Sequence, residues 1–324
     1  MTEYIIPFVT TFILAVMCGK LLLPLLIRLK AAQTEREDGP ASHKAKNGTP
    51  TMGGFIFLIP WTLVCAFYIP THRNIVALMI ATLGFAAVGF VDDYLKVIKK
   101  QNLGLRAWQK FLLQAVVAGI LMVYIATFTN LSLDMRIPFS PMFNAGGTAV
   151  MISLGVLSIP VDMLIMCGTV NGSNFTDGLD GLASSVTAVI AACIAISSVM
   201  TASGIAPAAM AFLGGLAGFL VYNHHPAKVF MGDTGSLALG GFVASGFIVM
   251  NMPIYIVIAA FIYFAEVMSV IIQVLYFRRT GGKRFFKMAP IHHHFELSGW
   301  SEVKTVLIFT AVTLVLCAVT LVAV

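Results

Sequence analysis

The sequence has 324 residues, of which 59% are hydrophobic and only 10% are charged, and its formal net charge is +6 at pH 7. A soluble domain carries about 25% charged residues, so this composition excludes an ordinary soluble globular protein. Apolar stretches long enough to cross a bilayer recur along the whole chain, and they predict an all-α integral membrane protein with about ten transmembrane helices. We expect residues 1–324 to form a single polytopic transmembrane domain.

The predicted spans follow from the length and apolarity of each stretch. In chain order they are residues 2–28, 52–70, 74–94, 110–128, 155–172, 181–200, 207–222, 236–250, 254–277 and 303–323. An even number of spans places both termini on the same side of the membrane. Between the fourth and fifth spans, residues 132–141 and 146–153 are predicted to pair as a short hairpin.

The lysines and arginines indicate which side is the cytoplasm. All but three of the 20 basic residues lie in or beside loops that the span count puts on one side, namely 29–51, 95–109, 173–180, 223–235 and 278–302. Cytoplasmic loops are enriched in lysine and arginine, so these loops are predicted to be cytoplasmic and both termini external. A positive cytoplasmic face suits anionic lipid or an anionic substrate. It does not favour nucleic acid, because the cations come from separate loops.

Aspartates gather at the cytoplasmic ends of the predicted spans. An ionisable group near membrane depth is costly, which makes it a candidate for function. Three distant segments contribute aspartates to this face: Asp92, Asp93, Asp177, Asp180 and Asp233. Asp162 and Glu266 lie deeper within their spans, where a structural hydrogen-bonded carboxyl is the favoured interpretation.

The third span ends in GFVDDYLKVIKK, residues 89–100. On a helix, Asp92 and Asp93 point about 100° apart, so they should not hold one atom equally. Asp93 and Lys96 are spaced i,i+3 and are expected to share a face. An isolated pair of this kind would indicate ion pairs at a helix end, but the other aspartates on the same face favour a functional site.

Two further aspartates lie in NGSNFTDGLDGLASS, residues 171–185, which joins two spans. Asn174 or Thr176 is predicted to cap the following helix, and the glycines let the backbone approach a ligand. A helix N-terminus of this kind is a ready site for phosphate oxygens. Capping accounts for Thr176 and Asp177, but it does not account for Asn174 and Asp180 as well.

Asp233 belongs to NHHPAKVFMGDTGS, residues 223–236, where two glycines flank it just before a span. An aspartate in such a turn is often structural. Beside other carboxylates it is also a good oxygen ligand for magnesium, which takes one or two carboxylates together with substrate phosphates. The predicted metal ion is therefore magnesium, and its predicted ligand is Asp233.

The segment APIHHHFELSGW, residues 289–300, follows the basic run RRTGGKRFFK at 278–287. Consecutive imidazoles beside these cations suit a phosphate-bearing substrate, and the alternative is a structural turn. Zinc is disfavoured because adjacent histidines on a helix cannot all face one tetrahedral ion. Earlier in the chain, GPASHKAKNGTPTMGG at 39–54 is either an ordered phosphate-binding turn or a surface loop.

Together these motifs resemble the phospho-N-acetylmuramoyl-pentapeptide transferases, a bacterial branch of the polyprenyl-phosphate N-acetylhexosamine-1-phosphate transferase superfamily. The matches occur in family order over nearly the full length. They are GTPTMGG at 48–54, DDYLK at 92–96, NFTDGLDGLA at 174–183, NHHPAKVFMGDTGS at 223–236 and APIHHHFELSGW at 289–300. The aspartate motifs mark only the superfamily, whereas APIHHHFE marks this branch. After the aspartate pair stands Tyr94, where other residues also occur in the family.

The resemblance implies a homodimer in the bacterial cytoplasmic membrane, with a magnesium-dependent active site on its cytoplasmic face. The implied reaction joins UDP-N-acetylmuramoyl-pentapeptide to undecaprenyl phosphate. Its products are UMP and undecaprenyl-pyrophosphoryl-N-acetylmuramoyl-pentapeptide (lipid I), an intermediate of peptidoglycan synthesis. The resemblance also implies inhibition by uridine nucleosides.

The resemblance further implies roles for individual residues. Asp92 is the expected base acting on the lipid phosphate, and Phe230 is expected beneath the uracil. The residues implied for catalysis are Asp92, Asp93, Lys96, Asp233, His292, His293 and His294. Those implied for substrate binding are Lys46, Thr49, Asn174, Asp177, Gly178, Leu179, Asp180, Asn223, Phe230 and Gln273. Covalent attack by an aspartate and direct attack by the lipid phosphate both remain open.

Two other functions compete with this one. A sister enzyme that loads N-acetylglucosamine-1-phosphate onto the same lipid would share the aspartates and differ mainly at 289–300. An ion-coupled transporter would also place aspartates in its spans, but it predicts acids near the midplane and an internal repeat. The acids here lie at one edge of the membrane, and the sequence has no clear repeat.

Overall fold

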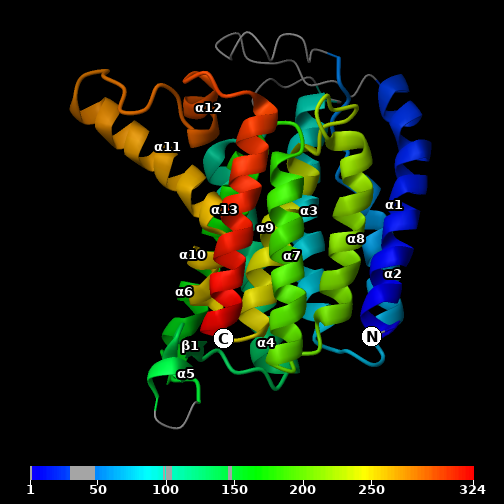
Figure 1. Ribbon diagram of the computed structural model, residues 1–324, viewed down its shortest axis with the longest axis vertical. Helices are drawn as coiled ribbons and strands as arrows, with labels where there is room; N and C mark the ends of the chain where they lie inside the picture. The colour runs from blue at the N-terminus through cyan, green and yellow to red at the C-terminus, as the bar shows by residue number, and fades with distance from the viewer. Residues whose placement is uncertain (1, 30–47, 98, 100–103, 145–147) are drawn as a thin grey trace.

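The computed structural model describes all of the chain except residues 1, 30–47, 98, 100–103 and 145–147. In the described part, nine helices are long and apolar enough to cross a membrane, which confirms the prediction of an all-α multi-pass membrane protein. They run side by side as a bundle (Figure 1). These helices are α1 (Thr2–Arg28), α3 (Ile75–Val97), α4 (Ala107–Phe128), α6 (Ser158–Thr176), α7 (Leu182–Met200), α8 (Ala206–Asn223), α9 (Gly232–Val249), α11 (Phe261–Arg279) and α13 (Glu302–Ala323).

Two of the predicted spans differ from the helices that the structure shows. Helix α2 (Phe55–Tyr68) has 14 residues, about 21 Å at 1.5 Å per residue, and is shorter than the predicted span 52–70. The predicted span 254–277 is not continuous, so that prediction was wrong. It consists of the 3₁₀ turn η3 (Pro253–Tyr255), the short helix α10 (Ile256–Ala259) and α11. The backbone leaves helical geometry at Ala260, with φ −104° and ψ 34°, and α11 leans away from the bundle (Figure 1).

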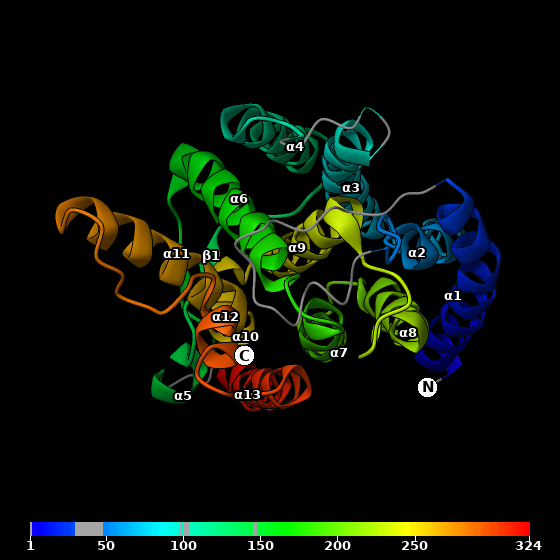
Figure 2. The ribbon, with the colours of Figure 1, turned by 90° about the horizontal axis from the view of Figure 1, so that it is seen from above.

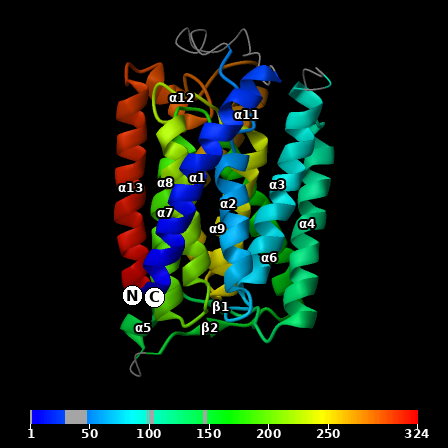
Figure 3. The ribbon, with the colours of Figure 1, turned by 90° about the vertical axis from the view of Figure 1, so that its right-hand side faces the viewer.

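Both termini lie at the same end of the bundle, as predicted (Figures 1 and 3). The short helix α12 (Ile291–Glu296) lies at the opposite end. At the terminal end, strands β1 (Met135–Arg136) and β2 (Met151–Ile152) pair in antiparallel register, with the helix α5 (Ser140–Phe143) between them in the sequence. This pairing confirms the predicted hairpin.

Helix α9 is the most deeply buried of the nine candidate spans and lies among α3, α6, α7 and α8 (Figure 2). Glycines allow its backbone to approach its neighbours. A Cβ on Gly89 of α3 would lie 2.0 Å from the carbonyl oxygen of Asp233. A Cβ on Gly240 of α9 would lie 2.4 Å from the Cα of Val170 in α6. Small residues permit such close helix packing in membranes. This packing brings the C-terminal ends of α3 and α6 next to the N-terminal end of α9.

The proposed orientation can be tested by labelling. We predict that Thr71, in the turn after α2, faces the exterior and that Lys283, in the loop after α11, faces the cytoplasm, because the basic segment between α11 and α12 lies at the end opposite the termini (Figure 1). In intact cells, a membrane-impermeant maleimide should label Thr71→Cys and leave Lys283→Cys unlabelled until the cells are opened. Each variant would be built in a background with the five native cysteines replaced. Labelling of both positions from outside would contradict this orientation.

Candidate active site

Asp93 joins helix α3 to the start of helix α9. Its side chain is 4% exposed. One carboxylate oxygen, Oδ1, accepts a hydrogen bond from the backbone N–H of Asp233 at 3.0 Å. The other, Oδ2, accepts hydrogen bonds from the N–H and the hydroxyl of Thr234, at 2.8 and 2.6 Å. The first N–H groups of a helix have no partner within it, and Asp93 satisfies two of those of α9, on Asp233 and Thr234, from a neighbouring helix. Both of its oxygens are used in this way.

The neighbouring Asp92 has different partners, as predicted from its position on the helix. Its Oδ2 lies 2.5 Å from Nζ of Lys96, and its Oδ1 accepts a hydrogen bond from the N–H of Leu105 at 2.7 Å. Lys96 and Asp93 both turn toward α9, since each contacts Asp233, which agrees with the expectation that they share a face. On its own helix Lys96 forms an ion pair with Asp92, one turn away.

Asp233 is the centre of the cluster. Its Oδ2 lies 2.9 Å from Nζ of Lys96 and 3.0 Å from Nζ of Lys110, and its Oδ1 accepts a hydrogen bond from Nδ2 of Asn174 at 2.8 Å. Lys110 also donates to Oδ1 of Asn174 at 3.1 Å. Residues of α3, α4, α6 and α9 therefore meet at one carboxylate. Lys110 was not among the predicted site residues, although a lysine at the start of an apolar span was the available signal.

The predicted helix cap after α6 was wrong. Helix α6 continues to Thr176, so Asn174 and Thr176 lie in its last turn, and the Thr176 hydroxyl donates to the carbonyl of Gly172 at 2.8 Å. The residue before α7 is Gly181, which has φ +76° and no capping side chain. Because it belongs to α6, the Asn174 amide can point at Asp233 instead of at the start of α7.

Negative charge exceeds positive charge in this cluster. Burial raises the pKa of the Asp177 carboxyl well above its usual value, and the charges of Asp233, Asp93 and Asp180 raise it further. Even with Asp177 protonated, the carboxylates of Asp233, Asp92 and Asp93 outnumber the ammonium groups of Lys96 and Lys110 among the described side chains. A divalent cation would compensate this excess of negative charge, and the available oxygen donors suit a hard ion.

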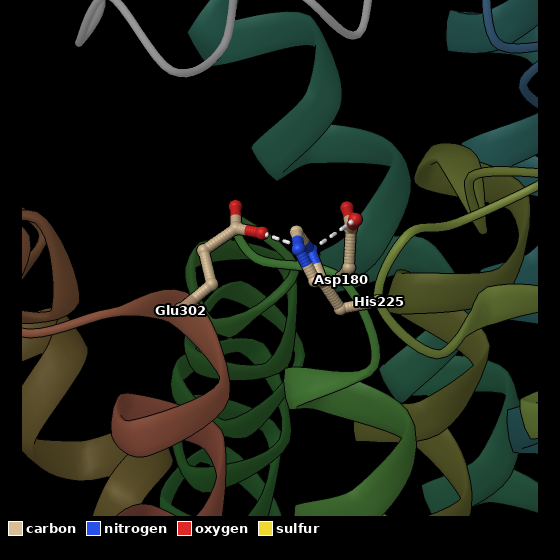
Figure 4. A group of neighbouring side chains, drawn as sticks. All are labelled: Asp180, His225 and Glu302. Carbon is tan, nitrogen blue, oxygen red and sulfur yellow. Dashed lines mark hydrogen bonds and ion pairs between the residues drawn. The ribbon is translucent and has the colours of Figure 1, made fainter.

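A second group of side chains could also hold a metal ion (Figure 4). Nδ1 of His225 lies 3.1 Å from Oδ2 of Asp180 and 2.7 Å from Oε2 of Glu302. The three ligand atoms all lie within 4.8 Å of one another. They come from the connection before α7, the connection after α8 and the first turn of α13. The imidazole therefore links three segments that are distant in the sequence, and neither His225 nor Glu302 was among the predicted site residues.

The three consecutive histidines face three different partners. Nδ1 of His292 lies 3.1 Å from Oε1 of Glu266, and Nδ1 of His293 lies 2.8 Å from Oε2 of Glu296. Nδ1 of His294 accepts a hydrogen bond from the backbone N–H of Lys287 at 3.1 Å. This divergence matches the argument that adjacent histidines on a helix do not share one ion.

The histidine segment lies against the loop that follows α6. A Cβ built on Gly178 would lie 2.2 Å from Nε2 of His292. Residues separated by more than a hundred positions in the sequence therefore meet at this glycine. The contact brings the predicted sugar and pyrophosphate side next to the aspartate-rich loop.

The remaining predicted substrate-binding residues lie around these groups. Asn223 is held within the protein, since its Oδ1 accepts from the Ser184 hydroxyl at 2.8 Å and its Nδ2 donates to the Val229 carbonyl at 3.0 Å. Gln273 accepts hydrogen bonds through Oε1 from two backbone N–H groups of the loop after α11. Leu179 is buried. Lys46 lies outside the described residues.

Phe230 and Thr49 lie on two segments that are bound to each other. The N–H of Phe230 donates to the carbonyl of Pro50 at 2.8 Å, and the N–H of Gly53 donates to the carbonyl of Phe230 at 2.9 Å. Thr49 directly precedes Pro50. The turn before α2 and the turn before α9 therefore form one unit beside the cluster.

Comparisons with known proteins agree with this arrangement. Residues 75–251 match the family model described as Glycosyl transferase family 4, and residues 46–58 match the Phospho-N-acetylmuramoyl-pentapeptide-transferase signature 1. The phospho-N-acetylmuramoyl-pentapeptide-transferase of Acetivibrio thermocellus is 47% identical over 320 residues, which cover 98% of this chain and 94% of the relative. The protein of the same name from Clostridioides difficile is 42% identical, with 100% and 98% covered.

This chain therefore belongs to the phospho-N-acetylmuramoyl-pentapeptide-transferase family, which confirms the resemblance seen in its motifs. The matched range 75–251 contains the three aspartate segments, and the relatives extend over the histidine segment as well.

The raised pKa of Asp177 predicts a pH-dependent stability. An unfolded aspartate ionises near pH 3.9, whereas folded Asp177 keeps its proton to a higher pH, so its contribution to stability falls as the pH rises above about 4. We expect Asp177→Asn to be more stable than the wild type at pH 7.5, with a smaller advantage at pH 4.5. Thermal unfolding in detergent, followed by tryptophan fluorescence, measures the difference.

Asp134→Asn is the control for this prediction. Hydrogen bonds from Ser153 and Ser132 lower the pKa of the Asp134 carboxyl, so its replacement should have the opposite sign at pH 7.5. If Asp177→Asn were less stable than the wild type at pH 7.5 and equal to it at pH 4.5, the electrostatic account of Asp177 would be wrong.

Proposed function

We propose that this protein transfers phospho-N-acetylmuramoyl-pentapeptide from its UDP conjugate to undecaprenyl phosphate, giving lipid I and UMP at the cytoplasmic face of the bacterial membrane. The observation that carries the proposal is the meeting of the aspartate–lysine cluster and the histidine segment at one end of the bundle, joined through Gly178 and His292. Family membership supports both the donor and the lipid acceptor. In this proposal residues 1–324 act as one catalytic unit.

The geometry suits the transfer of a phosphoryl group between two anions. Such a reaction depends chiefly on positioning and on neutralising charge in the transition state. Lys96 and Lys110 both reach Asp233 and supply positive charge where the phosphates would meet. Both oxygens of Asp93 accept hydrogen bonds from the start of α9, whereas Asp92 faces Lys96 and the N–H of Leu105. Asp92, which is not tied to the helix end, is therefore the preferred base acting on the lipid phosphate.

Magnesium is the cation that this site would hold. Asp233 is its proposed ligand, with Asp92 and Asp93 beside it, because carboxylates with substrate phosphates are the usual magnesium ligands. The excess of negative charge around Asp177 supports a divalent cation at this place. The group of Asp180, His225 and Glu302 suits magnesium less well, because it includes an imidazole. Magnesium, when bound, would neutralise charge on the pyrophosphate of the donor.

The nucleoside end of the donor is proposed to lie between the loop after α6 and the turn before α9. Phe230 would stack under the uracil, and Asp177, Gly178 and Asp180 would line the opposite wall. The histidines would meet the sugar-phosphate end, with Gln273 holding the adjoining loop. A homodimer and inhibition by uridine nucleosides belong to the same proposal.

An assay with two donors tests the function. Purified protein receives undecaprenyl phosphate, magnesium and either UDP-N-acetylmuramoyl-pentapeptide or UDP-N-acetylglucosamine, and the release of UMP is followed. We expect release with the muramoyl donor alone, because the histidine segment and the signature at 46–58 are those of the muramoyl branch. Release with UDP-N-acetylglucosamine alone would favour the sister enzyme. No release with either donor, together with ion-dependent solute uptake in vesicles, would favour the transporter.

Asp233→Asn tests the metal ligand. The substitution keeps nearly the same volume, and its amide oxygen can still accept from Lys96 and Lys110, so the fold should persist. A neutral amide is a poor replacement for a carboxylate on magnesium, and we expect turnover to fall by about 100-fold or more. Asp162→Asn, which removes a buried carboxyl of α6 outside this cluster, should be much milder. Wild-type turnover and magnesium dependence in Asp233→Asn would refute the assigned role.

A further inference from the structure

Glu266 and His292 form a buried pair that lies apart from the lysine network around Asp233. Glu266 belongs to α11 and its side chain has no exposed surface, while the side chain of His292 in α12 is 1% exposed. Their atoms Oε1 and Nδ1 lie 3.1 Å apart. The pair therefore ties the histidine segment to the carboxylate of a helix that crosses the membrane.

Each partner has a second polar atom that remains unsatisfied. Nε2 of His292 and Oε2 of Glu266 are buried, and neither has a hydrogen-bond partner among the described residues. Nearly all buried polar atoms in proteins are hydrogen-bonded, so an exception calls for an explanation. An acceptor or donor held ready for a ligand is one such explanation, provided that the atom points to a place where a ligand can bind.

On the proposed function Nε2 meets that condition, because it lies against a loop that the proposal assigns to the donor. It points at Gly178, where an added Cβ would lie only 2.2 Å away. Gly178 belongs to the loop after α6, and its neighbour Asp177 is the carboxyl whose pKa is raised by burial and, beyond that, by Asp233, Asp93 and Asp180. The unsatisfied nitrogen therefore faces the loop that the proposed function assigns to the nucleotide-sugar donor. Only a residue without a side chain leaves room for the ring here.

The carboxylate determines which nitrogen carries the proton. An ionised carboxylate can only accept hydrogen bonds, so a neutral His292 ring beside it carries its proton on Nδ1 and keeps a lone pair on Nε2. The hydrogen bond made by one ring nitrogen thus fixes the chemistry of the other. In this state Nε2 is a hydrogen-bond acceptor held in a fixed direction.

We propose that Glu266 is a positioning residue of this site, which fixes the orientation and tautomer of His292 so that Nε2 accepts a hydrogen bond from a hydroxyl or amide N–H of the nucleotide-sugar donor at Gly178. The identity of the donor rests on the proposed function, whereas the pair itself does not. A buried acceptor of this kind discriminates strongly against a molecule that lacks the matching donor group. Glu266 therefore contributes to substrate selection without touching the substrate.

Glu266→Gln separates this role from that of a simple clamp between α11 and α12. A glutamine has nearly the same size, and its amide can hold the ring either by accepting from Nδ1–H or by donating to a bare Nδ1. The contact between the helices is thus retained, but the tautomer is no longer fixed. A clamp predicts that Glu266→Gln behaves like the wild type, and tautomer control predicts that it does not.

The tautomer can be measured directly by ¹⁵N NMR of histidine-labelled protein in detergent, with the His292 signals assigned by their absence in His292→Ala. The expected wild-type pattern is a protonated Nδ1 and an unprotonated Nε2. In Glu266→Gln the His292 signals should shift toward the other tautomer. A wild-type ring with the proton on Nε2 and a bare Nδ1, or an unchanged pattern in Glu266→Gln, would overturn the proposal.

Kinetics provide the second measurement. Glu266→Gln should lower kcat/KM for UDP-N-acetylmuramoyl-pentapeptide by about 10- to 100-fold, the usual effect of removing the partner that orients a functional histidine, and should leave the KM for undecaprenyl phosphate unchanged. The double variant with His292→Ala should be no slower than His292→Ala alone, because both changes remove the same interaction. Effects that multiply in the double variant would overturn the proposal.

Asp162→Asn is the matched control. Asp162 is also a buried carboxyl of a membrane-spanning helix with an unpartnered oxygen, but it lies near the opposite end of α6 from Asn174, about 18 Å along the helix. It should keep wild-type kcat/KM and the wild-type His292 signals. If the wild-type protein released no UMP from this donor but showed the expected tautomer, the proposed function would fail while the positioning of His292 by Glu266 would stand.

Discussion

The contact between Asp93 and the start of helix α9 is the interaction on which the rest of the site depends. The first N–H groups of α9 have no partner within the helix, and they need an acceptor outside it. Asp93 of α3 supplies both oxygens for this purpose. Gly89, one turn earlier on the same helix, lets α3 approach close enough for the carboxylate to reach. Together they fix the position of Asp233, around which Lys96, Lys110 and Asn174 are arranged.

The site therefore combines two kinds of aspartate. Asp93 is satisfied by backbone and hydroxyl groups and works as part of the scaffold, whereas Asp92 and Asp233 face lysines and lie where phosphates would be neutralised. Asp177 has no comparable counter-charge and retains its proton more readily. In the proposed function, this composition would hold a cation and, with it, the pyrophosphate of the donor. Two adjacent aspartates on one helix make it possible for one to support α9 while the other faces a lysine.

Much of this could be predicted from the sequence, for physical reasons that also explain the errors. The lengths of the apolar stretches identified the membrane spans. Because successive loops alternate between the two sides of the membrane, the span count placed Asp92, Asp177 and Asp233 at one end. The break at Ala260 escaped notice because neither glycine nor proline marks it, and an apolar run does not show whether its helix is continuous. The choice of Asp92 over Asp93 as the partner of Lys96 depends on helix α9, which is far away in the sequence.

Other contacts of the site could not be predicted from local sequence spacing, because they also depend on helices that are distant in the sequence. Lys110 reaches Asp233 only because α4 packs beside α3. His225 meets Glu302 only because α13 begins at the same end of the bundle as the connection after α8. The sequence shows the histidine motif directly, but it does not show that His292 of this motif pairs with Glu266. Glu266 had been interpreted as a structural carboxyl deep in a span, and its contact with His292 joins that span to the motif.

The burial of α9 has a consequence for how the protein enters the membrane. Of the candidate spans among the described residues, α9 is the least apolar and also the most enclosed by protein. A segment of modest apolarity inserts less readily by itself, so it depends on surfaces already present in the bilayer. The helices that offer those surfaces, α3 and α6, precede α9 in the chain and leave the ribosome first. The order of the helices along the gene thus matches an order of assembly in which the carboxylate of Asp93 is in place before the end of α9 that needs it.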